Sequence, residues 1–308
     1  MKLQIQRGSL LDEVFPNHDH AALIPPRRMD FRTLLVALDG EPSCDERVRL
    51  AARFAAVHGS HLVGVASAGR IELTSGLGAA AGYIEAAAEA KAEAIRHASR
   101  WADRFQTICR EAGVASVEAA VHEGDPATAV LHHAHCADVA VIGQADPARA
   151  CFRDASRFAE EVVMHNARPT MVIPFAGKFA SVGDRVLVAW DDSHGSARSV
   201  ADALPLLRHA ARVHLRVWRH AREAAERLVR DRLQSVQRWM ARQGVACDAA
   251  VEITRAHIGD AILEQAAQLD VDLIVMGSYG HSRWTERLMG GATRTALARS
   301  KVPLLTSH

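Results

Sequence analysis

Four glycines near the C-terminal end of the sequence are grouped in two pairs. Gly277 ends the apolar run "VDLIVMG" and Gly280 follows it, whereas Gly290 and Gly291 come directly before the helical pattern "ATRTALARS". Glycine destabilises a helix or strand interior by about 0.5–1 kcal/mol, so its repeated use indicates that the backbone turns sharply or is closely approached. A helix that begins near Gly291 or Ala292 would expose backbone N–H groups and a partial positive charge, which suit a phosphate group.

A carboxylate ends another apolar run, since Asp191 closes "RVLVAWD". Carboxylate oxygens accept hydrogen bonds and therefore suit a hydroxyl-rich group such as ribose. An acid, a glycine turn and a helix start that share one crevice predict a nucleotide-binding site. Two local interpretations stay open: the glycines serve only as turns, and Asp191 or Asp192 serves only as a turn or helix-capping residue.

The sequence contains two copies of one pattern. The run "TLLVALD" corresponds to "RVLVAWD", 152 positions later. Gly143 and Gly277 are 134 positions apart, as are Pro169 and Pro303, so the later parts of the copies align without a gap. The first copy therefore has an excess of 18 residues, which we expect in "RIELTSGLGAAAGYIEAAAEA", before or within its long helix. Matching order and spacing indicate a tandem duplication.

The duplication divides the chain into an N-terminal arm (residues 1–30) and two repeats (31–175 and 183–308). Within each repeat, short apolar runs alternate with helical patterns, which predicts parallel strands joined by crossover helices. Near-continuous apolar runs such as "DLIVMG" are typical of a sheet that is covered on both faces. We therefore expect two tandem doubly wound α/β domains of five strands each, with ligands bound beyond the carboxyl ends of the strands.

The sequence resembles the universal stress protein family over residues 31–308. Nucleotide-binding members carry the pattern G-x2-G-x9-G-(S/T); Gly277, Gly280 and Gly290 match it with the correct spacing, and Gly291 stands at the Ser/Thr position. The resemblance implies Rossmann-like domains of the adenine nucleotide alpha hydrolase type that bind ATP, with or without Mg²⁺. It also implies that Asp191 is the strand-one acid and that the backbone of Val217, at the end of strand two, contacts adenine. The complete expected site is Asp191, Val217, Met276, Gly277, Gly280, Gly290, Gly291, Ala292 and Thr293.

The first repeat departs from this pattern. The positions that align with the four glycines are Gly143, Asp146, Ser156 and Arg157. Asp146 would place a carboxylate where phosphate binds, and like charges a few ångströms apart repel by about 1 kcal/mol in water and by more when partly buried. We therefore predict one competent site, in the second repeat, and no ATP binding by the first.

Composition argues against several other classes of protein. A formal net charge of +1 over 308 residues gives no broad attraction to nucleic acid or to an anionic membrane, and no apolar run approaches the roughly 18 residues of a membrane helix. Five scattered cysteines without a CxxC pair argue against a disulfide framework or a zinc ribbon and favour a reducing compartment. We therefore expect a cytoplasmic protein without nucleic-acid or membrane partners.

The stretch "LHHAHC" also permits a metal interpretation. In a helix, His132 and His135 would share a face and His133 would point elsewhere. A polar helix face is therefore the favoured interpretation, and a metal site is the alternative.

The leading hypothesis is a stress-response or signalling module that binds an adenine nucleotide and has no dedicated catalytic or metal-ligating residue. One alternative is slow ATP hydrolysis, with Asp191 or Asp192 orienting water. Another is a nucleotide-free interaction protein. Because relatives commonly pair through their last strands, "TMVIP" and "VPLLT" are expected to join the two repeats within one chain or to join two chains in a homodimer.

Overall fold

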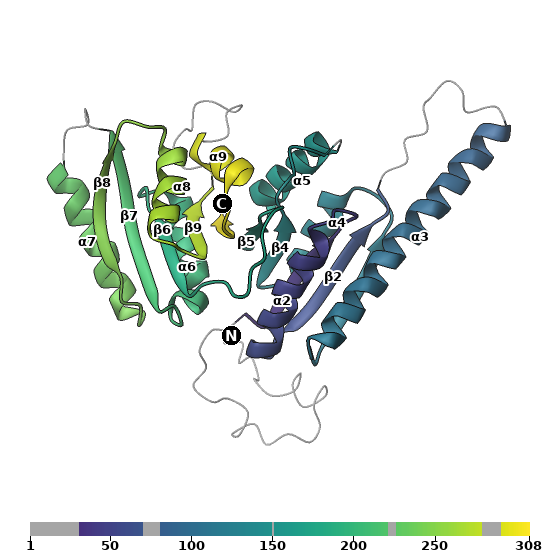
Figure 1. Ribbon diagram of the computed structural model, residues 1–308, viewed down its shortest axis with the longest axis horizontal. Helices are drawn as coiled ribbons and strands as arrows, with labels where there is room; N and C mark the ends of the chain where they lie inside the picture. The colour runs from purple at the N-terminus through teal and green to yellow at the C-terminus, as the bar shows by residue number, and fades with distance from the viewer. Residues whose placement is uncertain (1–30, 70–80, 150, 221–225, 279–290) are drawn as a thin grey trace, which may run out of the picture. The chain divides into compact units, whose positions relative to one another are not determined.

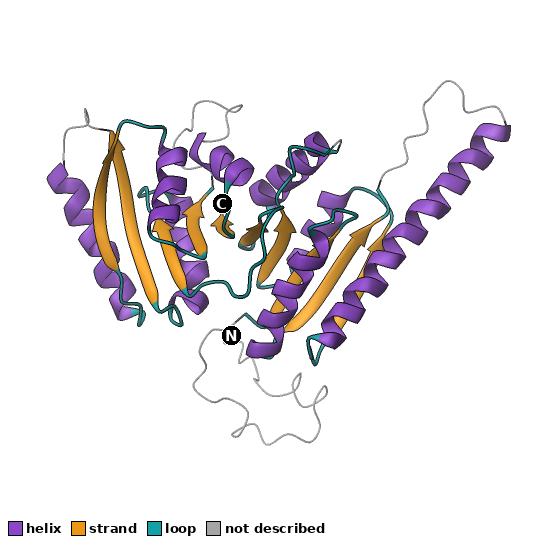
Figure 2. Cartoon of the chain, viewed as in Figure 1, coloured by secondary structure: helices purple, strands orange, loops and turns teal. Residues whose placement is uncertain are grey.

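The computed structural model describes residues 31–69, 81–149, 151–220, 226–278 and 291–308. These residues form one ten-stranded sheet with helices on both of its faces (Figures 1 and 2). The predicted N-terminal arm, residues 1–30, lies outside the described residues.

The two repeats contain the same succession of strands and helices. The first contains β1 (Thr33–Leu38), α2 (Cys44–His58), β2 (His61–Ser67), α3 (Ala81–Glu111), β3 (Val117–His122), α4 (Pro126–Ala134), β4 (Val139–Gly143), α5 (Phe152–His165) and β5 (Thr170–Ile173). The second contains β6 (Arg185–Ala189), α6 (His194–Leu207), β7 (Arg212–His220), α7 (Glu226–Arg242), β8 (Asp248–Thr254), α8 (Ile258–Gln268), β9 (Leu273–Gly277), α9 (Gly291–Arg299) and β10 (Leu304–Ser307).

The strand order confirms the expected pair of doubly wound, five-stranded domains. Across the sheet the order is β3-β2-β1-β4-β5-β10-β9-β6-β7-β8. All neighbouring strands within a repeat are parallel, whereas β5 and β10 pair antiparallel, with Leu304 opposite Val172. The pairing that we expected for the last strands therefore occurs between the repeats of one chain.

Strand β1 illustrates why the apolar runs are nearly continuous. Leu34, Val36 and Leu38 contribute to the core that includes residues of α2 and α3, and Leu35 and Ala37 contribute to the core that includes residues of α4 and α5. Successive side chains of a strand point to opposite faces, so a sheet covered on both faces requires apolar residues at every position.

The additional residues of the first repeat lie partly in its long helix. Helix α3 has 31 residues, against 17 in α7 of the second repeat. Phe105, Ile108 and Cys109 bury one stripe of α3 in the same core as the β1 residues. None of the described helices combines the length and the apolar character needed to cross a membrane.

Each repeat reverses its strand order beside the first strand. Strand β6 lies between β7 and β9, and β1 lies between β2 and β4. In an open parallel sheet, a ligand crevice forms beyond the carboxyl ends of the strands at such a reversal. The fold therefore offers two equivalent places for a site, which the two repeats fill differently.

Candidate functional site

A cavity of about 520 Å³ lies beyond the carboxyl ends of β6, β7 and β9. Its volume falls within the roughly 300–1,000 Å³ typical of small-molecule sites. Seven of the nine expected site residues line it: Asp191, Val217, Met276, Gly277, Gly291, Ala292 and Thr293. The other two, Gly280 and Gly290, lie outside the described residues.

One wall of the cavity is apolar. Strands β7 and β9 supply Val217, Trp218 and Met276, and the side of α7 that faces them supplies Val229 and Leu233. Val217, Met276 and Leu233 are buried. A wall of this kind suits a flat, largely apolar group, because such a group loses little by leaving water.

Two carboxylates line the cavity at the end of β6. Asp191 Oδ1 accepts hydrogen bonds from the Ser193 backbone N–H at 3.0 Å and from the Ser193 hydroxyl at 2.5 Å. Asp191 therefore stabilises the turn before α6, and the same side chain also lines the cavity. Asp192 has a φ of 65° and forms an ion pair with Arg232 of α7.

The residue that caps α6 is Ser193, so the helix-capping interpretation of Asp192 is wrong. Ser193 accepts a hydrogen bond from the Ser196 backbone N–H, and the Ser196 side chain accepts one from the Ser193 backbone N–H. This reciprocal capping box satisfies two N–H groups at the helix start. Asp192 is thereby left outside the helix, on the cavity wall.

The two described glycines of the pattern are each closely approached. A Cβ atom at Gly277 would collide with the backbone of Gly195 and Ser196 at the start of α6. A Cβ atom at Gly291 would lie 2.6 Å from His257 Nε2. Part of the glycine pattern is therefore required by packing of the protein itself, and Gly291 is the first described residue of helix α9.

The position of Val217 differs from the expectation. Strand β7 continues three residues beyond it, to His220, because β8 pairs with β7 that far. The Trp190 backbone N–H donates to the Arg216 carbonyl, so the backbone groups of Arg216 and, two residues later, Trp218 face the β6 side. The backbone N–H and C=O of Val217 face β8. The backbone N–H and C=O of Trp218 face the β6 side of the sheet.

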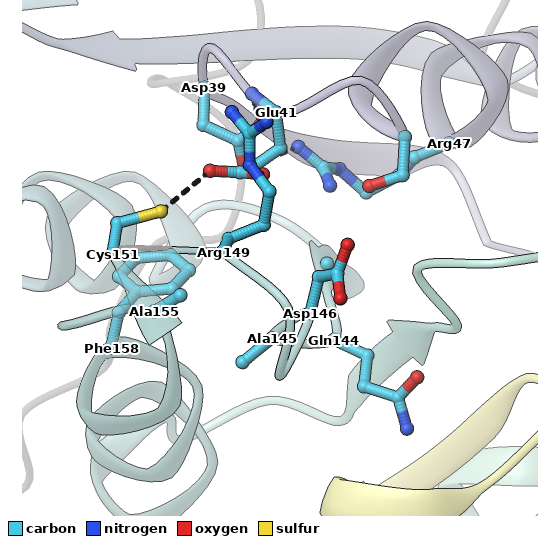
Figure 3. A pocket seen from close by; sticks show the side chains of 12 residues that line it. Asp39, Glu41, Arg47, Gln144, Ala145, Asp146, Arg149, Cys151, Ala155 and Phe158 are labelled. Atoms are coloured by element: carbon cyan, nitrogen blue, oxygen red, sulfur yellow. Dashed lines mark hydrogen bonds and ion pairs between the residues drawn. The ribbon is translucent and has the colours of Figure 1, made fainter. Parts of the chain in front are cut away.

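The corresponding place in the first repeat is divided between a cavity of about 30 Å³ (Figure 3) and one of about 200 Å³, and Asp39 and Glu41 line both. Arg47 of α2 donates to the Ala37 carbonyl at 2.8 Å and to Asp39 Oδ2 at 2.7 Å. Its side chain is only 1% exposed and lies against Gly143, with no room for a Cβ atom there. In the second repeat the aligned position is Ser199, whose short side chain donates to the Met276 carbonyl at 2.8 Å.

Two acidic residues and the segment that leads into helix α5 also lie at this place in the first repeat. Asp146 lines the small cavity, and the Glu41 carboxylate accepts from Cys151 Sγ at 2.8 Å (Figure 3). Helix α5 begins at Phe152, so the positions aligned with Gly290 and Gly291 lie inside a helix rather than at its start. The N–H groups at those positions are therefore used within the helix, which removes the feature that suits phosphate.

The histidines of "LHHAHC" are arranged differently from the expectation. His133 points towards β3, where its Nε2 lies 2.5 Å from His122 Nε2, and the ring centroids of His132 and His133 are 5.5 Å apart. Helix α4 ends at Ala134, which makes His135 the residue that follows the helix. In the described part of the chain, no group of three or more His, Cys, Asp or Glu residues is arranged to hold a metal ion.

Comparison with known proteins agrees with the fold and the repeats. The model of the universal stress protein family matches residues 30–174 and again residues 183–308. A universal stress protein from Archaeoglobus fulgidus DSM 4304 is 18% identical, with 89% of this chain and 97% of that chain covered and a TM-score of 0.65. A protein of unknown function from Pseudomonas aeruginosa PAO1 is 15% identical, with 89% and 92% covered and a TM-score of 0.54.

No curated protein sequence matches the chain. The structural similarities, all below 25% identity, bear on the fold alone. The family model, however, covers both repeats and hence most of the sequence. This protein therefore belongs to the universal stress protein family, as a member with two tandem repeats.

Proposed function

We propose that the second repeat binds ATP or a related adenine nucleotide, and that the protein acts through this binding in stress response or signalling. The proposal rests on one observation: seven expected site residues, from four separate parts of the sequence, line one cavity of about 520 Å³. By contrast, the equivalent place in the first repeat holds two smaller cavities, of about 30 Å³ beside Asp146 and of about 200 Å³ beside Trp101.

The chemistry of the cavity walls suits the three parts of a nucleotide. The apolar wall of Val217, Met276 and Leu233 accommodates the base, whose polar edge meets the backbone amide and carbonyl of Trp218. Asp191 accepts from ribose hydroxyls, and the backbone N–H groups at the start of α9 bind phosphate.

Calorimetric titration with Mg-ATP tests the proposal, using nucleotide-free protein and two variants that exchange one residue between the repeats. The Gly280→Asp variant copies Asp146 into the second repeat, and the Asp146→Gly variant copies Gly280 into the first. We expect about one equivalent of ATP in the wild type, loss of binding in Gly280→Asp and an unchanged stoichiometry in Asp146→Gly. Absence of binding at millimolar ATP in the wild type would refute nucleotide binding and favour a protein-interaction role.

Slow ATP hydrolysis is the second candidate function, because two carboxylates, Asp191 and Asp192, line the same cavity. Either could orient a water molecule for attack on a phosphate. Phosphate release by the wild type, Asp191→Asn and Asp192→Asn proteins, all at saturating ATP, separates the two candidates. Turnover above background that is lost in one variant while ATP remains bound supports hydrolysis, whereas equal background rates support binding alone.

A further inference from the structure

His257 and Gly291 lie against each other where α8 and α9 begin. A Cβ atom at position 291 would be 2.6 Å from His257 Nε2 and 2.8 Å from its Cε1, closer than such atoms approach in proteins. The imidazole therefore occupies the space that a side chain at position 291 would need. Both residues line the cavity of the second repeat.

A second close contact holds the two helix starts together. A Cβ atom at Gly259 would be 2.6 Å from the Thr295 Cβ and 3.0 Å from the Ala292 Cα. Glycine at position 259 thus lets the first turn of α9 pack directly on the first turn of α8. Because His257 immediately precedes α8, this packing places the exposed imidazole beside the first described residues of α9.

One hydrogen bond determines which ring nitrogen can act as a donor. His257 caps α8, and its Nδ1 accepts from the Gly259 backbone N–H at 3.3 Å. An Nδ1 that accepts carries no proton, so the proton of the neutral ring resides on Nε2. Nε2 is also the ring atom that lies nearest position 291. The ring therefore presents an N–H donor at the start of α9.

On the basis of the proposed nucleotide function, we propose that His257 donates this Nε2–H hydrogen bond to a phosphate group at the start of α9. The imidazole replaces the Ser or Thr hydroxyl that the glycine pattern would place at position 291. The donor comes from a neighbouring helix, and Gly291 is the residue that makes room for it. As a result, the cavity discriminates between phosphorylated ligands and the corresponding nucleosides.

The distribution of charge in the cavity supports this placement of phosphate. Asp191 and Asp192 lie at the end of β6, where their carboxylates would repel a phosphate. The start of α9 instead combines backbone N–H groups, a positive helix end and the Nε2–H of His257. A phosphate there avoids the carboxylates and gains a side-chain donor.

The His257→Asn variant tests the proposal without removing the helix cap. The Asn side-chain oxygen can accept from the Gly259 N–H, but the shorter side chain no longer places a donor where His257 Nε2 lies. We expect the ATP affinity, measured by calorimetry at pH 8, to fall about tenfold, the size of one hydrogen bond to a charged group. The adenosine affinity should be unchanged. Adding Gly291→Ser to His257→Asn supplies a hydroxyl in the vacated space and should recover most of the ATP affinity.

The outcomes distinguish this inference from the proposed function. If the wild type binds no ATP, the nucleotide function fails and the role of His257 fails with it. If the wild type binds ATP and His257→Asn binds it equally well, only the role of His257 is overturned. An equal loss of ATP and adenosine affinity would show general damage to the cavity and would likewise overturn a phosphate-specific role.

Discussion

Arg47 and Asp39 form a 2.7 Å ion pair in the first repeat, and the arginine side chain of that pair is only 1% exposed. The acid that follows β1 is thus neutralised from within the fold, whereas Asp191, its counterpart after β6, lines a cavity of about 520 Å³. The aligned residue, Ser199, is small and donates to the Met276 carbonyl. The repeats therefore differ at this helix position as well as at the lost glycines.

Replacing Arg47 by alanine should destabilise the protein without creating a second nucleotide site. The variant loses hydrogen bonds to the Ala37 carbonyl and to Asp39, and it leaves a void in a buried place. We expect the free energy of unfolding in urea to fall by about 2 kcal/mol or more. ATP stoichiometry should stay at one, because Asp146 still faces the small cavity.

Arg49→Ala is the matched control for this prediction. Arg49 lies on the same helix, but its side chain is 41% exposed and its ion pairs with Asp45 and Glu46 are at the surface. Such pairs contribute about 0–1 kcal/mol, so the control should change stability little. Similar losses in both variants would contradict the special role of the buried guanidinium.

Gln144 should be required for stable attachment of α9 to the first repeat. Its side-chain N–H₂ donates to the Leu297 carbonyl at 3.0 Å and to the Ser300 carbonyl at 3.1 Å, at the end of α9. The residue is 6% exposed, so truncation leaves buried polar groups without their partner. We expect Gln144→Ala to lower the free energy of unfolding by about 2 kcal/mol.

Gln144→Glu sharpens this prediction because its side chain has nearly the same shape. A carboxylate at that place faces two carbonyl oxygens and the negative end of a helix, both of which repel it. Chemical unfolding at pH 7.5 should show a larger loss for the glutamate variant than for the alanine variant. The opposite order would mean that volume matters at this position and the hydrogen bonds do not.

The fold could be predicted from the sequence because strands that are buried on both faces of the sheet have nearly continuous apolar runs. The sequence also predicted seven of the residues that line the cavity of the second repeat, since they lie near the carboxyl ends of strands or in the first described turn of α9, beside the reversal of strand order. Other features depended on long-range packing that no local pattern records. Arg47 occurs in "DERVRLAAR", which is typical of a solvated helix face, and only the fold reveals that its side chain is buried.

The errors have similar physical causes. Val217 was expected at a strand end, but the length of β7 is set by its pairing with β8, which is distant in sequence. His257 was overlooked because a single histidine in a polar segment carries no signal; the nearest clue was a glycine at position 291 where a hydroxyl was expected. The contact of His133 with His122 is not predictable from the sequence, because it depends on the packing of α4 against β3.

The histidine cluster of the first repeat should make stability depend on pH below neutrality. Burial, and then the positive charges of His122 and His132, lower the pKa of His133 below its usual value of 6.5, while Glu118 opposes the shift. The unfolded chain therefore takes up this proton at a higher pH than the folded protein. The penalty is absent above about pH 6.5 and grows as the pH falls from there towards the lowered pKa.

His133→Asn should weaken this dependence. Urea unfolding of the wild type and the variant at intervals from pH 7.5 to pH 5 measures it as the slope of the unfolding free energy against pH. We expect a smaller loss of stability on acidification in the variant. Equal slopes would mean that His133 takes up its proton as readily in the folded protein as in the unfolded chain.

The surroundings of Cys151 in the first repeat predict that its thiol reacts slowly. The hydrogen bond from Cys151 Sγ to Glu41 Oε1 raises the pKa of this thiol, and partial burial adds to the effect (Figure 3). Only the thiolate reacts with iodoacetamide, so Glu41 should slow alkylation. Glu41→Gln removes the negative charge at nearly constant shape and should therefore accelerate labelling of Cys151 at pH 8 several-fold.

Peptide mapping of the alkylated protein assigns the rate to the correct cysteine. Cys109 supplies an internal reference, because its side chain is fully buried and burial raises its pKa to about 12. It should stay unlabelled in both proteins while Cys151 gains label faster in the variant. Labelling of Cys109 would indicate that Glu41→Gln has opened the fold, and an unchanged rate at Cys151 would show that Glu41 does not control this thiol.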